Sequence, residues 1–480
     1  MIAGTKNRFY GRQVAARAIY GSMRMEKKRE IKLTLQPMRN TGAGAAGQIV
    51  RNTLSVCPVC MKRLPASVVR RGSAYFLEKS CPEHGSYSVV VWRGKHPTYE
   101  DWGAGYTPPA EEQDNLPGCP GNCGLCPGHR QKTCCALVEV TRRCDLRCPV
   151  CFAGAGGDDP DPPVGKLYEQ FKRLVKNGDT FIQLSGGEPT VRDDLAEIVA
   201  AAKLAGCENI QLNTNGVRLG TDRALAGSLR EAGLSFVFMQ FDGTKDEIYN
   251  KLRGKPLLGE KTDAIKNCAG ALLGVTLVPT LAPGVNVSNI GEIIDFGLSN
   301  SPAVRGVHFQ PISYFGRYPR APENRDRITL PEVLRAIEVQ TGGKFGIPDF
   351  VPSRCDHPYC GFHGDFAVLP HKRIMKLTPK EAVGCCEGEA HLKNRNFVSR
   401  RWKRSAESEA DCCGSDDPTE MGAFVTRIKS NGFTVTAMAF QDVYNLDIER
   451  LRRCSLHVSE GGNLTPFCAK YITAADGEGL

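Results

Sequence analysis

From Ala136 to Gly316 the sequence alternates short apolar runs with segments of helical length, and it does so six times. This alternation is typical of parallel strands joined by helical crossovers, because a parallel strand buried on both faces is apolar throughout. The expected strands are Leu137–Val140, Phe181–Leu184, Ile210–Leu212, Phe236–Phe241, Thr276–Leu281 and Val307–Gln310. Six units are too few for a closed (β/α)8 barrel. The pattern therefore predicts an α/β fold with an open, partial (β/α)6 barrel.

Helices are expected between these strands. The clearest are Val164–Lys176 and Asp193–Ala205, and a glycine follows each of them, at Gly178 and Gly206. After Arg317 the alternation fades, although Leu330–Glu338 still has the pattern of a helix.

Three cysteines follow the first expected strand in a C-x3-C-x2-C pattern, at Cys144, Cys148 and Cys151. An iron–sulfur cube normally takes four thiolates, so three of them leave one iron without a protein ligand. An open position is what a metal site needs for chemistry. A zinc knuckle is the alternative, but structural zinc sites favour paired C-x2-C units. The triplet therefore predicts a catalytic [4Fe–4S] cluster.

The next strands end in polar or glycine-rich segments, where parallel barrels place their chemistry. These segments are Gly186-Gly187-Glu188-Pro189, Asn213-Thr214-Asn215-Gly216 and Gln240-Phe241-Asp242-Gly243. Paired glycines let a backbone approach a ligand closely. The polar residues of the other two segments are candidates for ligand contacts, and tight turns are their alternative explanation.

Two knuckles near the start of the chain have the spacing of a closed metal site. Cys57 and Cys60 form a C-x2-C unit, and Cys81 and His84 form a C-x2-H unit. Two strand-like runs, Ala66–Val69 and Ala74–Leu77, lie between the knuckles. Four ligands around one zinc or one rubredoxin-like iron would leave no open position, so the site would be structural. Unconnected thiols are the alternative.

A second C-x3-C-x2-C triplet occurs at Cys119, Cys123 and Cys126, among glycines and prolines. No strand precedes it, and a fourth thiolate lies close by, at Cys134 or Cys135. This context predicts a closed auxiliary [4Fe–4S] cluster with Cys134 as the preferred fourth ligand, and zinc is the alternative.

The remaining cysteines are dispersed. Cys355, Cys360, Cys454 and Cys468 could converge on a second auxiliary cluster or could be buried thiols. The vicinal pairs Cys385-Cys386 and Cys412-Cys413 allow no choice between ligand, redox pair and surface thiol. Cys207 and Cys268 fall within or at the end of expected helices and are predicted core residues.

The net charge of +10 is concentrated at the start of the chain. Residues 1–51 contain eleven Lys and Arg against two Glu, a surplus of nine, which leaves +1 for all other residues. A nucleic-acid partner is therefore not favoured, and the basic start resembles either an organelle presequence or the product of a misassigned start codon. The 21 cysteines at ligand spacing indicate metal in a reducing compartment, hence the cytoplasm. No apolar stretch has the length of a membrane span.

Four regions follow from these patterns. They are a basic extension over 1–50, a region with the metal knuckles and the first auxiliary cluster over 51–132, the barrel over 133–318, and a C-terminal region with a second auxiliary cluster over 319–480.

The stretch from about residue 55 to 472 resembles one subgroup of the radical S-adenosylmethionine (SAM) superfamily, which includes tetraether lipid synthase and the dihydropterin methyltransferase of methanogens. The likeness is carried by CPVC, CPEHG, CGLC with HRQKTC, LSGGEPTVRDDL, QFDGTKDEIYNKLRG, FQPISYFGR, CDHPYC, DVYNLDIERLRRCSLH and PFCAKY. Two features depart from the subgroup. PFCAKY replaces the more usual PFCAYN, and the basic start lies outside the likeness.

The resemblance implies which residues bind cofactors. SAM would chelate the open iron at Cys144, Cys148 and Cys151 and would contact Gly186, Gly187, Glu188, Pro189, Val150, Asn215, Gln240 and Asp242. Auxiliary [4Fe–4S] clusters would be held by Cys119, Cys123, Cys126 and Cys134 and by Cys355, Cys360, Cys454 and Cys468, giving three clusters in all. Zinc or mononuclear iron would bind Cys57, Cys60 and Cys81, with His84.

The resemblance also implies a reaction. A 5′-deoxyadenosyl radical would initiate methylation, alkylation or carbon–carbon bond formation at an unactivated carbon of a lipid or a small heterocycle. An electron donor such as ferredoxin or flavodoxin would be a partner, and a lipid substrate would bring the enzyme to a membrane. The alternatives are a radical SAM maturase of a peptide or protein and a non-catalytic metal protein.

Overall fold

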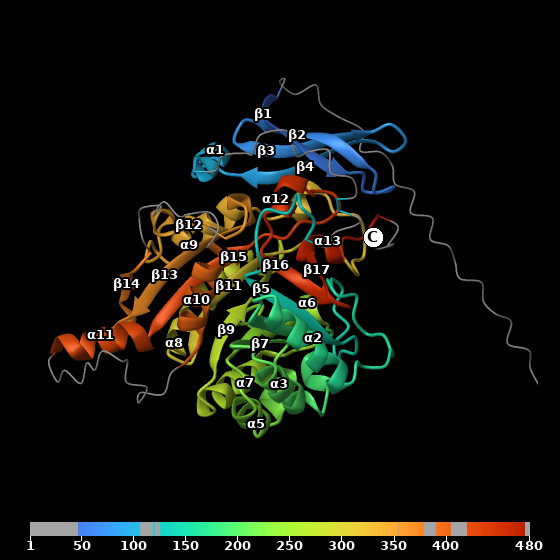
Figure 1. The fold of residues 1–480 in the computed structure, drawn as a ribbon. Helices are drawn as coiled ribbons and strands as arrows, with labels where there is room; N and C mark the ends of the chain where they lie inside the picture. Colours follow the sequence, from blue (N-terminus) through green and yellow to red (C-terminus); the bar gives the residue numbers. More distant parts are fainter. Residues whose placement is uncertain are drawn as a thin grey trace, which may run out of the picture. The chain divides into compact units, whose positions relative to one another are not determined.

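The computed structural model describes residues 47–105, 119–120, 125–353, 355–378, 390–404 and 420–475. The described chain begins with an antiparallel sheet in the order β1-β2-β3-β4, which is followed by a short helix (Figure 1). Its elements are β1 (Gln48–Val56), β2 (Arg63–Arg71), β3 (Ala74–Cys81), β4 (Gly85–Arg93) and α1 (Tyr99–Gly103). The two expected strands lie within β2 and β3, whereas β1 and β4 were not predicted.

The main sheet contains all six expected parallel strands as direct neighbours, in sequence order. They are β5 (Cys135–Thr141), β6 (Phe181–Gly186), β7 (Asn209–Thr214), β8 (Phe236–Gln240), β9 (Gly274–Val278) and β11 (Val304–Pro311). The run expected over Thr276–Leu281 divides into β9 and β10 (Thr280–Leu281), with Pro279 between them. Proline has no N–H to donate and so interrupts a strand ladder.

Two strands from the C-terminal part of the chain extend the parallel core, one at each edge. β15 (Gly432–Met438) is parallel to β11, and β16 (Leu456–Glu460) is parallel to β5. The sheet therefore has two more parallel strands than the six βα units provide. Because these strands pair with partners far away in sequence, local periodicity could not reveal them.

Antiparallel strands and further helices complete the C-terminal part of the main sheet. β13 pairs with β12, β14 and β15, and β17 pairs with β16. The elements are α9 (Leu330–Gln340), β12 (Val351–Pro352), β13 (Gly361–Val368), β14 (Ile374–Lys376), α10 (Ala390–Trp402), α11 (Glu420–Ser430), α12 (Ile448–Arg452), β17 (Asn463–Pro466) and α13 (Phe467–Tyr471).

Helices cover one face of the parallel strands, as Figure 1 shows for α2, α3, α5 and α7. The bounds are α2 (Val164–Lys176), α3 (Leu195–Leu204), α4 (Val217–Thr221), α5 (Leu225–Glu231), α6 (Asp246–Arg253), α7 (Leu258–Gly270) and α8 (Ile290–Ser299). In α2 the buried residues Leu167, Phe171 and Leu174 recur at the spacing of one helix face. The expected helix over Val164–Lys176 is thus confirmed, and the one expected from Asp193 begins two residues later.

Side chains on the parallel strands alternate between this helix-covered face and the inside of the open barrel. On β6, Ile182 and Leu184 belong to the main hydrophobic core, whereas Gln183 lines a cavity. A period of two is the rule for a strand, and here it places polar side chains inside the barrel.

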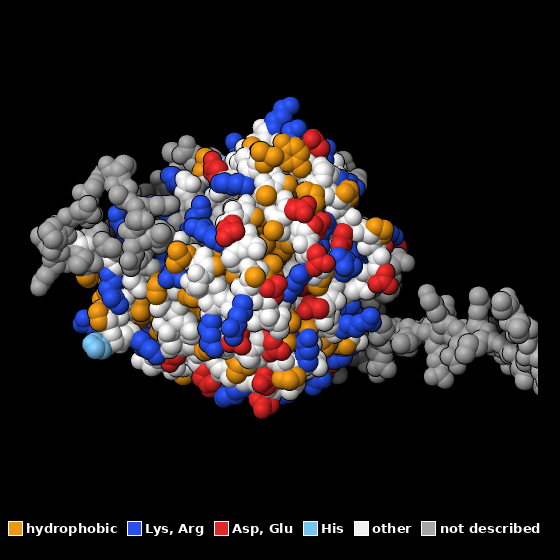
Figure 2. Space-filling view, turned by 90° about the horizontal axis from the view of Figure 1, so that it is seen from below, with side chains coloured by type: hydrophobic (Ala, Val, Ile, Leu, Met, Phe, Trp, Pro, Cys, Tyr) orange, Lys and Arg blue, Asp and Glu red, His pale blue; other side chains and the backbone are white. Residues whose placement is uncertain are grey.

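One face of the molecule carries Lys and Arg interspersed with Asp and Glu (Figure 2). This face offers no extended basic surface, in accord with the low net charge of the chain beyond residue 51. Within the described ranges, no helix is both long and apolar enough to cross a bilayer.

Candidate active site and metal centres

The cysteine triplet that follows the first parallel strand lies in the loop after β5, at the carboxyl end of the parallel sheet. Cys144, Cys148 and Cys151 share one apolar cluster with Leu146 and Tyr249. The loop is anchored at Cys151, whose N–H donates to the Arg317 carbonyl at 2.9 Å and whose carbonyl accepts from the Arg317 N–H at 2.9 Å. All three thiols face a common cavity.

Two glycines at the end of β6 let its backbone approach the triplet loop. Gly186 has a φ of +118°, and a Cβ atom there would lie 2.2 Å from the Thr141 carbonyl oxygen. A Cβ atom at Gly187 would lie 2.1 Å from the Arg143 carbonyl oxygen. The close approach also allows the Gly187 N–H to donate a hydrogen bond of 2.8 Å to the Thr141 carbonyl. Glycine is therefore required at both positions, because any side chain would displace the loop that carries the cysteines.

Glu188 is buried beside this loop, with 1% of its surface exposed. Its carboxylate accepts from the Thr190 N–H at 3.0 Å, the Thr214 hydroxyl at 2.7 Å and the Asn215 N–H at 2.5 Å. Burial raises the pKa of Glu188, and the hydrogen bond from the Asn215 amide opposes that rise. The carboxylate is therefore held in one position at the edge of the cavity.

Asn215 joins the triplet loop to α7. Its side-chain amide donates to Asp145 at 2.6 Å, and its backbone carbonyl accepts from the ammonium of Lys261. Burial lowers the pKa of Lys261 to about 8, and Asp242 opposes this effect. Asn215 itself lines the cavity, in agreement with a ligand contact.

The residues around the triplet fit a [4Fe–4S] cluster and SAM. Three thiols can hold three irons, and the open fourth iron would face the cavity. The glycine backbone and the carboxylate of Glu188 provide acceptors for an amino group beside that position. Arg253 adds the positive charge that a carboxylate ligand requires, since its side chain lines the same cavity.

Two of the expected SAM contacts lie elsewhere. Asp242 is fully buried, does not line the cavity, and accepts two hydrogen bonds of 2.7 Å from Arg253. The expected contact between Asp242 and SAM stays a prediction. In this geometry the carboxylate of Asp242 binds Arg253, which itself lines the cavity. Pro189 is also absent from the cavity wall and begins the 3-10 helix η2 (Pro189–Val191).

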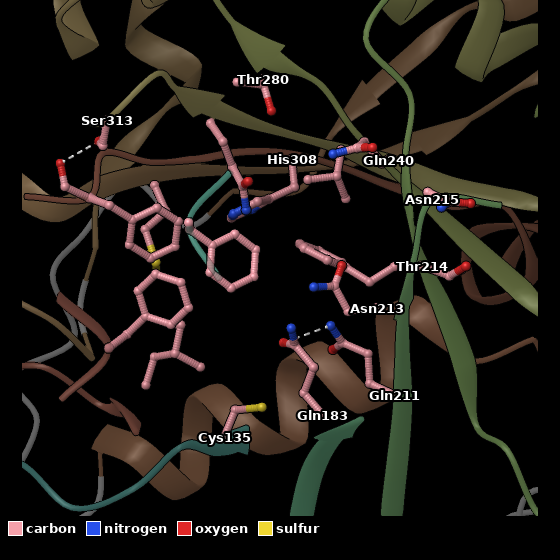
Figure 3. Close-up of a pocket in the computed structure, with 18 of the residues that line it drawn as sticks. Cys135, Gln183, Gln211, Asn213, Thr214, Asn215, Gln240, Thr280, His308 and Ser313 are labelled. Atoms are coloured by element: carbon pink, nitrogen blue, oxygen red, sulfur yellow. Dashed lines mark hydrogen bonds between the residues drawn. The ribbon is translucent and has the colours of Figure 1, made fainter. Parts of the chain in front are cut away.

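The cavity has a volume of about 270 Å³ and extends from the triplet into the open barrel. Its polar wall includes Gln183, Gln211, Asn213, Gln240 and His308 (Figure 3). Val150, Asn215 and Gln240, all expected to contact SAM, line it too. Aromatic side chains complete the wall. They are Phe152, Phe181, Phe238, Phe315, Trp402, Phe440 and Phe467.

The opposite end of the cavity is closed by the start of β5 and by α10. Cys135 and the α10 residues Asn394 and Trp402 line this end. The amide of Asn394 donates to the Cys134 sulfur at 3.2 Å. The same cavity therefore reaches from the SAM triplet to a cysteine of the first auxiliary set.

The ligands of the N-terminal metal site come together as expected. The sulfur atoms of Cys57, Cys60 and Cys81 and the Nδ1 atom of His84 all lie within 4.8 Å of one another. The Nδ1 atom of His84 lies 3.6 Å from the sulfur of Cys57 and 3.5 Å from the sulfur of Cys81. Three sulfurs and one imidazole nitrogen at this spacing fit a tetrahedral zinc or mononuclear iron. No other group of this kind occurs in the described part of the chain.

Cysteines from the two expected auxiliary quartets lie near one another. The Cys355 thiol, expected in the other cluster, is close enough to Cys134 to lower the pKa of Cys134. Cys360, Cys454 and Cys468 lie close enough for each sulfur to influence the charge of another. The assignment of Cys134 and Cys355 to separate clusters stays a prediction, and the structure adds that the two expected sites are neighbours.

The pairing of β16 with β5 explains this arrangement. Leu456 lies opposite Cys135, so the segment around Cys454 runs beside Cys134. The Cys134 N–H donates to the Ser455 carbonyl at 2.8 Å, and a ring nitrogen of His129 lies 2.8 Å from the Cys454 carbonyl. Cys119 packs in the same hydrophobic cluster as Cys468. Segments far apart in sequence thus supply neighbouring thiols.

Several expected residues lie outside the described residues. They are Cys123, Cys385, Cys386, Cys412 and Cys413. Cys126 is described and half-buried. Cys207 and Cys268 are confirmed as core residues, with 1% and 0% of their surfaces exposed.

The sequence analysis missed most of the cavity wall. Gln183 and Gln211 interrupt otherwise apolar strands, and this was the signal that could have found them, since a polar residue in a buried strand needs a partner. His308 gave the same signal within β11. Trp402 gave none, because α10 meets the barrel only through tertiary contacts.

The comparisons with known proteins agree with this site. Residues 138–297 match the radical SAM superfamily, and residues 49–93 match the HMPTM N-terminal zinc ribbon domain. The fold and the triplet thus define a radical SAM enzyme.

A curated relative covers nearly the whole chain. The 7,8-dihydro-6-hydroxymethylpterin dimethyltransferase of Methanocaldococcus jannaschii is 32% identical over 483 residues, which are 87% of this chain and 92% of that protein. The chain belongs to the family of this radical SAM dimethyltransferase. The Fe-coproporphyrin III synthase of Methanosarcina barkeri is 31% identical over 51% of this chain and 59% of its own length.

Solved structures match over less of the chain. Streptococcus suis SuiB aligns with a TM-score of 0.38 at 16% identity, over 44% of this chain and 46% of SuiB. Methylornithine synthase aligns with a TM-score of 0.36 at 15% identity, over 45% and 64%.

Proposed function

We propose that this radical SAM enzyme alkylates a carbon of a compact, flat heterocycle of the pterin class, bound inside the barrel. One observation carries the proposal. The cavity that receives the cysteine triplet is also lined by converging carboxamides and an imidazole, at Gln183, Gln211, Asn213, Gln240 and His308. The M. jannaschii relative is named for a pterin substrate, which agrees with this wall.

The size and polarity of the cavity favour a heterocycle over a lipid. A volume of about 270 Å³ suits a small molecule, whereas two alkyl chains need a long apolar groove. Neutral amide groups offer both donors and acceptors, which a heterocycle can use and an alkyl chain cannot. A peptide substrate is not favoured, because the described polar wall is enclosed between α10 and the triplet loop.

When bound at the triplet, the cluster and SAM supply a 5′-deoxyadenosyl radical. The protein residues hold the partners of that chemistry in place. Gly186 and Gly187 bring the backbone against the triplet loop, Glu188 is held as an acceptor, and Arg253 presents a positive charge. The apolar cluster with Leu146 and Tyr249 excludes water from the cysteine loop.

The proposal also covers the auxiliary clusters and the N-terminal metal. We propose two auxiliary [4Fe–4S] clusters beside the SAM cluster, held by the cysteine segments that meet at β5 and β16, and one zinc or iron at Cys57, Cys60, Cys81 and His84. A low-potential donor such as ferredoxin or flavodoxin would reduce the clusters in the cytoplasm. A heterocyclic substrate requires no membrane association.

The test is product analysis under anaerobic conditions. The reconstituted enzyme is incubated with SAM, dithionite, a one-carbon donor (a second molecule of SAM or a reduced one-carbon carrier) and 6-hydroxymethyl-7,8-dihydropterin, and in parallel with a dialkyl glycerol lipid. Mass spectrometry should find a carbon-bound methyl group in place of hydrogen on the pterin and no change in the lipid. Cross-linked alkyl chains with an unchanged pterin would overturn the proposal.

A further inference from the structure

Two glutamine side chains inside the barrel form a pair. The Gln211 amide nitrogen donates to the Gln183 side-chain oxygen at 3.1 Å, and Figure 3 shows the pair at the cavity wall. The register of β6 and β7 sets the two residues directly opposite each other. Their exposed fractions are 8% and 2%, so each carboxamide is largely withdrawn from bulk water.

The pair leaves polar atoms available to a ligand. Each carboxamide has one carbonyl oxygen and two N–H donors, and the mutual bond uses one donor and one acceptor site. Among the described residues, neither side chain makes another hydrogen bond. Neither side chain has a nitrogen or oxygen atom that is fully buried and also lacks a hydrogen-bond partner. The side-chain oxygen of Gln211 and the amide nitrogen of Gln183 are thus available to a ligand, since both residues line the cavity and their side chains are held together by the mutual bond.

This arrangement offers an acceptor next to a donor. A cyclic amide (lactam) presents the complementary order, an N–H beside a C=O. If the side-chain amides of both glutamines are flipped, so that nitrogen and oxygen exchange places, the pair still offers one donor and one acceptor. A carboxylate or phosphate has acceptors alone and would leave the glutamine oxygen facing another oxygen.

The surroundings select for an uncharged, flat ring. The residues labelled with the pair in Figure 3, among them Cys135, Asn213, Gln240 and His308, are not Asp, Glu, Lys or Arg. The cavity wall as a whole also includes Glu188, Arg253 and Asp356. Phe238 lies with its ring centre 5.4 Å from that of Trp402 and 5.1 Å from that of His308. Aromatic faces of this kind stack on planar rings.

We propose that Gln183 and Gln211 together recognise the lactam edge of the heterocyclic substrate and so determine substrate specificity. This inference rests on the proposed function. It adds which edge of the ring is bound, and by which residues. The alternative is that the pair merely satisfies two buried amides and has no effect on ligand choice.

The experiment compares two probes, pterin and 2-aminopteridine, which lacks the 4-oxo lactam. Equilibrium binding to the anaerobic, cluster-loaded enzyme with SAM is measured by quenching of ligand fluorescence. A site built for the lactam should bind pterin about 100-fold more tightly, because the analogue leaves buried polar groups unpaired. Gln183→Leu and Gln211→Leu should each reduce that preference to about threefold or less.

Two further variants keep the result interpretable. Gln211→Glu preserves the size of the side chain but removes its donors, and it should also lose the preference for pterin. Gln170→Leu is the matched control, because Gln170 lies on α2 and donates to Ser459 outside the cavity wall. It should bind both probes like the wild type.

The outcomes separate the two proposals. If the wild type prefers pterin and all three pair variants retain that preference, the role of the pair is overturned and the proposed function stands. If the wild type binds pterin with no preference over 2-aminopteridine, the inference is likewise overturned. If it binds neither probe although it cleaves SAM, the proposed function is overturned, and the inference with it.

Discussion

Arg253 donates two hydrogen bonds of 2.7 Å to the carboxylate of Asp242; both side chains are buried, and Arg253 alone of the two lines the cavity. The exposed fractions are 6% and 0%. Arg253 and Cys148 line the same cavity, so the guanidinium connects the carboxylate of Asp242 to the site that holds the cysteine triplet. Asp242 thus orients the guanidinium of Arg253 without lining the cavity itself.

Replacing Asp242 by Asn should leave the buried charge of Arg253 without its partner. Breaking a buried ion pair in this way typically costs about 3–5 kcal/mol. We expect a clearly lower Tm and weaker SAM binding. Asp263→Asn is the control, since Asp263 and Lys266 form an exposed pair worth about 0–1 kcal/mol. Equal Tm values for the two variants would contradict this role.

Gly187→Ala should dislodge the triplet loop. A Cβ atom at this position would lie 2.1 Å from the Arg143 carbonyl oxygen, and backbone must move to accept it. The variant should retain less iron after anaerobic reconstitution and release less 5′-deoxyadenosine. At Gly165, on α2, a Cβ atom meets nothing within 4 Å, so Gly165→Ala should match the wild type in both measurements. Full iron content in Gly187→Ala would refute the close approach.

Cys57→Ser should remove the metal of the N-terminal site and leave the SAM chemistry in place. The four ligand atoms lie within 4.8 Å of one another and belong to a separate small sheet. Elemental analysis should show the loss of one zinc or one iron per chain, with unchanged sulfide. Cys207→Ala, which alters a buried core thiol, should keep every metal. Loss of sulfide in Cys57→Ser would argue against independent sites.

His308 should make the protein less stable in acid. Burial lowers its pKa from 6.5 to about 4, so between these values the unfolded chain binds a proton that the folded chain does not. The free energy of unfolding should then fall by up to about 1.4 kcal/mol per pH unit as the pH decreases. His308→Gln lacks this titration and can still reach the Thr436 hydroxyl. The wild type should lose more Tm than the variant between pH 7 and pH 5; parallel losses would count against a buried neutral imidazole.

The sequence predicted the parts of this molecule that depend on local pattern. The six parallel strands, the helix over Val164–Lys176 and the knuckles at Cys57 and Cys81 follow from periodicity and spacing. The helix ends were also predictable, because Gly178 and Gly206 adopt the positive φ values that favour glycine.

The parts that depend on tertiary pairing were not predictable. β15 and β16 join the sheet from far along the chain, and the same pairing brings Cys454 beside Cys134. Spacing in sequence therefore could not show which auxiliary cysteines become neighbours. The sequence likewise did not show that the carboxylate of Asp242 binds Arg253, which lies on the following helix and lines the cavity.

The most direct test of the account is the release of 5′-deoxyadenosine by the reconstituted enzyme with SAM and dithionite, measured with and without 6-hydroxymethyl-7,8-dihydropterin. The wild type should release 5′-deoxyadenosine, and the amount released should rise when the pterin is present. None should be released by Cys144→Ala, Cys148→Ala or Cys151→Ala, although each should retain the N-terminal metal. A wild-type enzyme with its full iron and sulfide that releases no 5′-deoxyadenosine would contradict the account, as would release that survives loss of a triplet cysteine.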